Sequence, residues 1–210
     1  MRVDSLEFIY DDAWGFTACK FDELSFFKKA SSAFQIKCEC LKCASSSCPK
    51  EACDDYHKCN KKTTFEGLKG VDVLLQNNNS LFLVEMKDYR NCSIPPIDHI
   101  VSEVAKKFRD TLYVLWCGSQ KDEEDDEKRL ADSARRKKLG LSFVFHFESS
   151  APAYASGLFS SRRGVIALSS VRDKLAKKLG YMSTHLYVID MAAMRHSPDL
   201  LPWKVEEARP

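Results

Sequence analysis

The sequence has no long apolar run and no strong net charge, and both absences limit what the protein can be. No apolar stretch approaches the ~20 residues that a membrane-spanning helix needs. Acidic residues interrupt residues 1–16, where a secretory signal would need continuous apolar character. We therefore expect a cytoplasmic protein without a membrane partner. A net charge of +2 provides no global basic field of the kind that indicates nucleic-acid binding.

Several patterns typical of common enzyme classes are also missing. The chain has no phosphate-binding glycine loop, no dinucleotide fingerprint and no Ser/His/Asp order. Isolated histidines, which we interpret as surface or packed residues, are His99, His146, His185 and His196. With 210 residues, 44% of them hydrophobic, the chain is long enough to bury a full core. We expect a single domain spanning residues 1–210.

Cysteine, in contrast, is abundant and unevenly placed. Six of the nine cysteines lie in one stretch, with His57 among them: Cys38, Cys40, Cys43, Cys48, Cys53 and Cys59. In a reducing cytosol such a cluster favours metal over disulfides. Residues 40–62 have almost no large apolar side chain, so we expect an insertion that one structural Zn²⁺ organises. The candidate ligands are Cys40, Cys43, Cys48, Cys53 and Cys59, while an iron–sulfur cluster and unligated thiols are the alternatives.

Hydrophobic periodicity predicts an α/β protein. We expect helices over 21–30, 97–115, 120–138 and 169–180, and strands over 33–40, on both sides of a turn within 70–87, over 141–148 and over 184–190. Asp98 is the expected N-cap of the helix over 97–115, Gly180 the expected end of the helix over 169–180, and Pro198 the start of an irregular tail. This order predicts a three-layer architecture with a mixed central sheet flanked by helices.

The predicted hairpin within 70–87 carries the most informative charges. Side chains alternate across a strand, so Glu85 and Lys87 should share one face. Asp72 lies between two valines of the preceding strand, and pairing would bring its carboxylate close to that of Glu85. Two carboxylates repel each other, whereas Mg²⁺ or Mn²⁺ would hold both and also bind phosphate oxygens. The alternative is a structural ion pair at the end of a strand.

Asp72, Glu85 and Lys87, in an αβββαβ order, resemble the PD-(D/E)xK nuclease superfamily, which has the restriction-endonuclease-like fold. The resemblance covers roughly residues 21–117. It implies that Asp72 and Glu85 bind the catalytic metal, that the Met86 carbonyl is a third ligand, and that Lys87 orients the attacking water. The proline that leads the family motif is absent, since a valine precedes Asp72.

The same resemblance implies further site residues on the flanking helices. Many members of the superfamily add an acid from the first helix, and Glu23 is the candidate here, ahead of Glu7. Some members use a polar residue on the helix that follows the Glu-x-Lys strand, where Lys106 and Lys107 lie. Lysines in and around residues 40–62 suit contact with a phosphate backbone.

These observations predict a metal-dependent nuclease, with DNA favoured over RNA as the substrate, in prokaryotic defence or a mobile element. A chain of this length has little room for a separate specificity domain, so we expect a homodimer or a partner protein that activates or targets it. The alternative is a catalytically silent, zinc-stabilised adaptor on the same fold that binds nucleic acid or protein.

Overall fold

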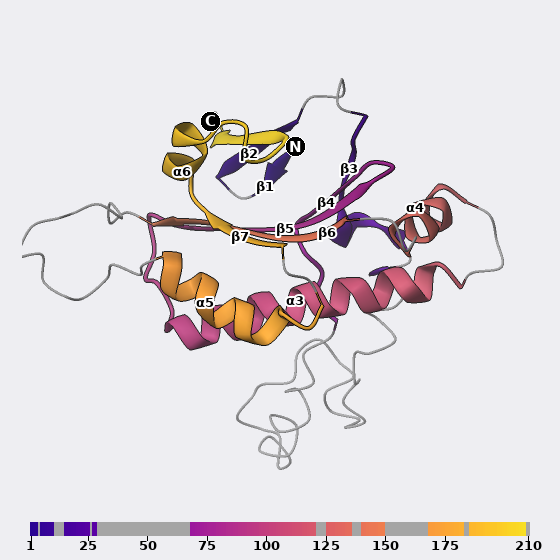
Figure 1. Ribbon diagram of the computed structural model, residues 1–210, viewed down its shortest axis with the longest axis horizontal. Coiled ribbons are helices and arrows are strands. Elements are labelled where there is room, and N and C mark those ends of the chain that lie inside the picture. Colours follow the sequence, from indigo (N-terminus) through magenta and orange to yellow (C-terminus); the bar gives the residue numbers. More distant parts are fainter. Residues whose placement is uncertain are drawn as a thin grey trace, which may run out of the picture.

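The computed structural model describes residues 1–3, 5–10, 15–25, 27–28, 68–120, 125–135, 140–149, 168–182 and 185–208. The cysteine-rich insertion predicted over 40–62 and the strand predicted over 33–40 lie outside these residues. The zinc prediction therefore stays a prediction. The described parts form an α/β structure that is built around a mixed sheet of five strands (Figure 1).

The five-stranded sheet has the order β3-β4-β5-β6-β7. Its strands are β3 (Thr17–Lys20), β4 (Val73–Gln76), β5 (Ser80–Tyr89), β6 (Gly140–Ser149) and β7 (His185–Ile189). Neighbours from β3 to β5 are antiparallel, whereas β5, β6 and β7 are parallel to one another. The predicted hairpin is confirmed: Asn77 Oδ1 accepts hydrogen bonds from the main-chain N–H groups of Asn79 and Ser80 and so stabilises the turn.

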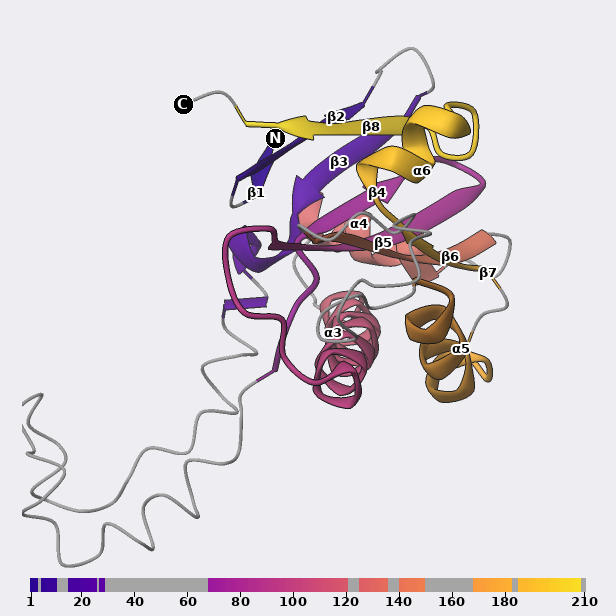
Figure 2. The same ribbon diagram turned by 90° about the vertical axis from the view of Figure 1, so that its left-hand side faces the viewer.

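Helices cover one face of this sheet. The longest is α3 (Ile97–Gly118), and α5 (Leu168–Leu179) lies beside it on the same face (Figure 2). Both form where the sequence repeats apolar residues every three or four positions, and α5 ends directly before Gly180, as predicted. A shorter helix, α4 (Asp126–Arg135), packs against α3 and buries Ala131.

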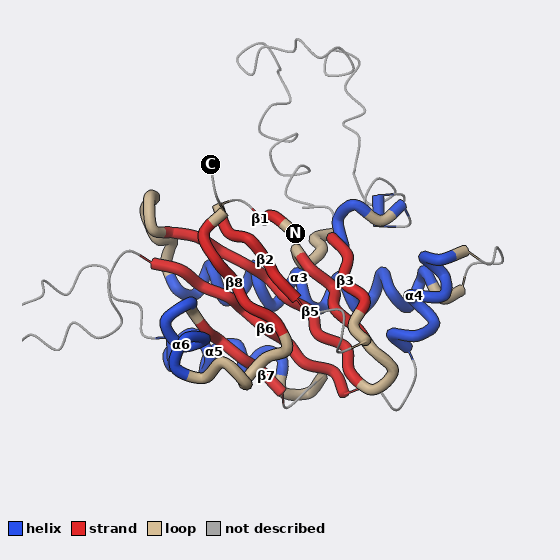
Figure 3. Tube along the Cα trace, turned by 90° about the horizontal axis from the view of Figure 1, so that it is seen from above, coloured by secondary structure: helices blue, strands red, loops and turns tan. Residues whose placement is uncertain are grey.

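A second, three-stranded sheet covers the other face. It has the order β1-β2-β8 and contains β1 (Arg2–Val3), β2 (Leu6–Tyr10) and β8 (Trp203–Glu207). With α6 (Met191–His196) it lies over the larger sheet when the molecule is seen from above (Figure 3). The prediction of an irregular tail after Pro198 was wrong, because β8 alternates buried and exposed residues and pairs antiparallel with β2, near the start of the chain.

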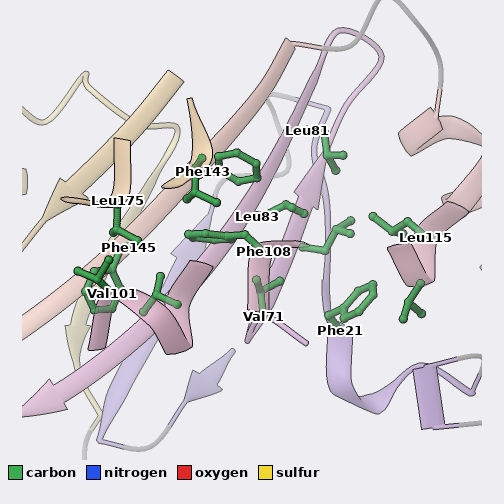
Figure 4. Close-up of a cluster of buried hydrophobic side chains, with 14 of the residues drawn as sticks. Phe21, Val71, Leu81, Leu83, Val101, Phe108, Leu115, Phe143, Phe145 and Leu175 are labelled. Atoms are coloured by element: carbon green, nitrogen blue, oxygen red, sulfur yellow. The ribbon is translucent and has the colours of Figure 1, made fainter. Parts of the chain in front are cut away.

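Two apolar cores follow from the alternation of side chains across the strands. On the helix side, Leu83 of β5 and Phe143 of β6 pack with Phe108 of α3, whose ring centroid lies 4.8 Å from that of Phe143 (Figure 4). On the opposite side, Val84 and Met86 pack with the small sheet. Because residues 81 and 83 face the helices, Glu85 and Lys87 face them as well.

The region predicted as a helix over 21–30 begins differently. Phe21–Glu23 form a 3₁₀ helix, η2, and Leu24 then takes an extended conformation that interrupts the helix. The N–H of Phe21 donates to the Asp72 carbonyl (3.3 Å), which ties η2 to the start of β4. A 3₁₀ turn fits here because Phe21 must turn inward immediately after β3, and its ring is fully buried.

Two smaller expectations also differ. Pro96, not Asp98, is the N-cap of α3, since its carbonyl accepts from the N–H of Ile100 at 3.1 Å. Asp98 lies in the first turn, where a carboxylate still stabilises the helix dipole. Asp72 lies just before β4 and not inside it, because β4 begins at Val73.

Candidate active site

The predicted carboxylates meet where β4 begins and β5 nears its end. Val73 pairs with Val84, and extending this antiparallel register by one position places Asp72 opposite Glu85. Asp72 Oδ2 accepts a hydrogen bond from the main-chain N–H of Met86 at 2.7 Å. This bond fixes the Asp72 side chain against β5. The structure therefore brings Asp72 and Glu85 together, as the hairpin predicted.

A lysine from α3 lies between these two carboxylates. Lys107 Nζ is 2.8 Å from Glu85 Oε2 and 2.7 Å from Glu85 Oε1, and it is 3.4 Å from Asp72 Oδ1. The aligned hydrogen bond goes to Oε2, whereas Oε1, which is buried, lacks an aligned donor. The ammonium is itself mostly covered, with 17% of the side chain exposed. A cationic group thus already occupies the space between the two acids.

Lys87 lies on the same face of β5, two residues after Glu85. Its Nζ is 3.1 Å from Glu85 Oε1, which confirms that the two side chains share one face. Lys87 is one-third exposed, whereas Glu85 has no exposed surface. The arrangement gives a buried carboxylate at the base of the site and a solvent-accessible ammonium above it.

Burial has the largest effect on the pKa of Glu85. Loss of hydration, followed by repulsion from Asp72, raises the pKa of Glu85 from its ordinary value near 4.5 to about 7. The lysines Lys107 and Lys87 act in the opposite direction but do not compensate fully. A carboxyl group whose pKa is raised to near 7 is typical of catalytic sites, and buried ion-pair networks also contain such groups.

Two cavities open beside this group, and Lys87 lines both of them. One cavity, of about 250 Å³, is lined by Asp72 and Lys87 together with Arg2, Lys20 and Asp22. The other, of about 310 Å³, reaches Glu85 and Lys107, and Glu103 also lines it. Lysine and arginine side chains around the first cavity make it suitable for an anionic ligand.

The remaining predicted residues lie at different distances from the group. Glu23 is largely exposed and pairs with Lys20 at 3.3 Å, while its neighbour Asp22 lines the cavity that Asp72 and Lys87 share. Glu7 lies in the small sheet, where it pairs with residue 206 of β8. Lys106 pairs with Asp110 at 3.3 Å, whereas the adjacent Lys107 contacts Glu85 and Asp72.

Sequence reasoning missed the contribution of the N-terminal strands. Arg2, from β1, lines the same cavity as Asp72 and Lys87, although it lies about seventy residues away along the chain. No local pattern marks this position. The only usable signal is the apolar alternation of Leu6 and Phe8, which are buried and indicate that a β strand packs near the core.

The end of β5 is also anchored to the small sheet. Arg90 donates to Asp88 through Nε (2.9 Å) and Nη2 (2.7 Å) and contacts Glu207 of β8 through Nη1. Ser5 donates to Asp88 from the other side. Hydrogen bonds from Arg90, and secondarily from Ser5, hold the pKa of Asp88 well below its usual range. These contacts fix the position of the strand that carries Glu85 and Lys87.

The donor set agrees with a small hard cation. Two carboxylates converge, one buried carboxylate oxygen lacks an aligned donor, and a cation-sized group already lies between them. Oxygen ligands of this kind suit Mg²⁺ and Mn²⁺. Within the described ranges, no group of three or more His, Cys, Asp or Glu side chains gathers at a metal-binding distance.

Comparison with known proteins gives one partial likeness. A cysteine–tRNA ligase of Neisseria meningitidis serogroup A is 31% identical over 122 residues, and the alignment covers 53% of this chain. The chain spans only 17% of that ligase. No family model and no solved structure matches the chain. None of the helices in the described part of the chain has the length and apolar character that crossing a bilayer requires.

Proposed function

We propose that this protein is a metal-dependent nuclease of the restriction-endonuclease-like class, which hydrolyses phosphodiester bonds. The observation that carries the proposal is the convergence of Asp72, Glu85 and Lys87 where β4 begins and the central strand β5 nears its end. The chain order gives partial support, because the antiparallel β4-β5 hairpin is followed by α3 and the parallel strand β6, as the resemblance implies. In the described residues β3 comes before η2, so the helix expected ahead of the three antiparallel strands does not lead them.

Under this proposal each residue has a distinct role. Asp72 and Glu85 would hold Mg²⁺ or Mn²⁺, with the Met86 carbonyl as a third ligand. The metal, when bound, polarises the phosphate and lowers the pKa of a coordinated water. Lys87 orients the attacking water and stabilises the charge that develops on the phosphate. The position of Asp22 favours it over Glu23 as the additional acid, since Asp22 lines the shared cavity.

The proposal extends to the parts of the protein around this site. One Zn²⁺, bound by cysteines of residues 40–62, is proposed to be structural. DNA remains the favoured substrate, but the likeness to a cysteine–tRNA ligase makes tRNA a substrate worth testing beside it. A homodimer or a partner protein in the cytoplasm would supply target recognition.

A catalytically silent adaptor is the second candidate, and one observation favours it. Lys107 and Lys87 both lie within 3.1 Å of the Glu85 carboxylate, so this network has its own cations without a metal. Such a cluster could serve stability alone. A measurement of nuclease activity distinguishes the nuclease from the catalytically silent adaptor.

The decisive assay incubates the purified protein with linear, circular and single-stranded DNA, with RNA and with tRNA, each with Mg²⁺, Mn²⁺ or EDTA. We expect cleavage with a divalent cation and none in EDTA. Asp72→Asn and Glu85→Gln should abolish it, while Asp98→Asn, which changes an exposed carboxylate on α3, should not. Undiminished cleavage by both Asp72→Asn and Glu85→Gln would refute the proposal that these carboxylates form the nuclease site.

A further inference from the structure

Lys107 contacts the proposed metal ligands but has no role among those proposed above. Its ammonium lies within 3.4 Å of both carboxylates that are assigned to the metal, in the place that the metal would occupy. We propose that Lys107 is a built-in counter-cation that competes with the divalent metal and must leave the Asp72–Glu85 pair before metal binds. This inference rests on the proposed function, since it concerns the same metal site.

Charge balance requires this exchange. Asp72 and Glu85 together carry two negative charges when both are ionised. Lys107 and Lys87 already lie beside them, at 2.7 and 3.1 Å from Glu85 Oε1. A divalent cation added to both ammonium groups would place four positive charges around two negative ones in a largely buried space. Like charges at such distances disfavour one another strongly, so one ammonium has to move.

Lys107 is the ammonium that overlaps the metal position. Lys107 lies within 3.4 Å of both acids, at 3.4 Å from Asp72 Oδ1 and 2.7 Å from Glu85 Oε1. Its main chain is fixed, because the neighbouring residues Val104 and Phe108 of α3 are buried in the core. The four-carbon side chain is flexible, so the charged end can move while the helix stays in place.

The structure also provides a place for the displaced ammonium. Lys107 lines the cavity of about 310 Å³ together with Glu103, which precedes it by four residues on α3. Residues four apart on a helix lie on one face, and a Glu that precedes a Lys by this spacing forms a favourable pair. Glu103 now contacts Lys69. The displaced Lys107 would join that pair and remain near the phosphate, where its charge is useful.

Affinity measurements test the competition directly. Lys107→Met keeps a side chain of similar length without the charge, and Lys106→Met is the matched control, because Lys106 pairs with Asp110 instead. An opposite charge at this distance changes the proton affinity of a carboxylate by about ten- to a thousandfold. We therefore expect calorimetry to show Mn²⁺ binding at least about tenfold tighter in Lys107→Met, with Lys106→Met like the wild type.

Thermal unfolding and lysine labelling give readouts independent of cleavage. In EDTA, Lys107→Met should unfold at a lower temperature than the wild type, and Mn²⁺ should raise its unfolding temperature more. In the wild-type protein, mass spectrometry after amine acetylation should show Lys107 more reactive with Mn²⁺ than with EDTA, whereas Lys106 stays constant. The labelling needs no variant, so it applies even if Lys107→Met does not fold.

The outcomes separate the two claims. Equal or weaker Mn²⁺ binding in Lys107→Met, or Lys107 reactivity that Mn²⁺ does not change, would overturn the counter-cation role while leaving a cleaving wild-type enzyme as a nuclease. Absence of metal binding in the wild type and in Lys107→Met would overturn both claims. Binding by Lys107→Met but not by the wild type would support the competition between Lys107 and the metal, but it would overturn the proposed metal-dependent activity of the wild type.

Discussion

Glu85 should make the metal-free protein less stable as the pH rises, and replacing it with glutamine should remove that loss. The side chain has no exposed surface, and burial together with Asp72 raises its pKa to about 7. In the unfolded chain the same carboxyl ionises near its ordinary value of 4.5. The folded protein therefore keeps a proton between these two pH values that the unfolded chain has released.

The direction and the size of the change in the free energy of unfolding follow from this difference in pKa. Between pH 4.5 and about 7 the folded state binds more protons at Glu85, so the free energy of unfolding falls as the pH rises. The contribution is fully present below pH 4.5 and is lost as the pH passes through the folded value. Since each tenfold change in proton affinity is worth about 1.4 kcal/mol, the loss amounts to roughly 3 kcal/mol.

Denaturant unfolding in EDTA from pH 4.5 to pH 8 measures this loss. The wild type and Glu85→Gln should be similar in stability at pH 4.5, and the variant should be more stable by roughly 3 kcal/mol at pH 8. Asp98→Asn serves as the control for an exposed carboxylate. A constant difference between wild type and Glu85→Gln across this range would refute the reasoning, because it would mean that Glu85 is ionised in the folded protein throughout.

Four further predictions concern separate parts of the structure. Lys87→Arg keeps the charge but not the compact ammonium, so cleavage should slow by about 10²- to 10³-fold with little change in metal binding; full activity would exclude a water-orienting role. Arg2→Ala should weaken nucleic-acid binding and reduce its salt dependence; an unchanged affinity would mean that the cavity lined by Arg2, Asp72 and Lys87 does not contact the substrate. Phe108→Ala should lower the free energy of unfolding by about 3–5 kcal/mol, measured by denaturant unfolding, because it removes a fully buried ring from the helix-side core. Metal analysis after dialysis should find about one zinc per chain, and a folded, zinc-free protein whose clustered thiols all react would contradict this.

The hairpin and the long helix could be predicted because their signals are local. The turn around Asn77 has suitable polar residues, and the stripe of apolar residues from Ile97 onward has a clear helical period. Alternation along β5 then placed Glu85 and Lys87 on one face, and the structure confirms it. These features depend on neighbours within a few positions of the chain.

The small sheet could not be predicted because its pairing is not local. β8 pairs with β2 at opposite ends of the chain, and two prolines near residue 200 indicated an irregular segment. A strand as short as β1, with Arg2 and Val3 alone, has no periodicity to detect. For the same reason the place of Arg2 beside Asp72 and Lys87 depends on tertiary packing alone.

The sequence also could not predict which of two adjacent residues reaches the site. Lys106 and Lys107 are adjacent on one helix, and only the angle of α3 over β5 decides that Lys107 reaches the carboxylates while Lys106 pairs with Asp110. Asp22 and Glu23 differ in the same way: both are exposed, but only Asp22 lines the cavity that Asp72 and Lys87 share, whereas Glu23 pairs with Lys20. A shift of one residue changes the side that a side chain faces.

The most direct test of the central claim is the rate at which the protein nicks supercoiled DNA with Mn²⁺, measured for the wild type and for Asp72→Asn in parallel. Asp72 contacts the Met86 N–H and Lys107 but lies outside the buried core, so its amide analogue should fold. We expect the wild type to nick the DNA, EDTA to stop the nicking, and Asp72→Asn to be inactive. Equal nicking by the two proteins, or nicking that continues in EDTA, would contradict this expectation.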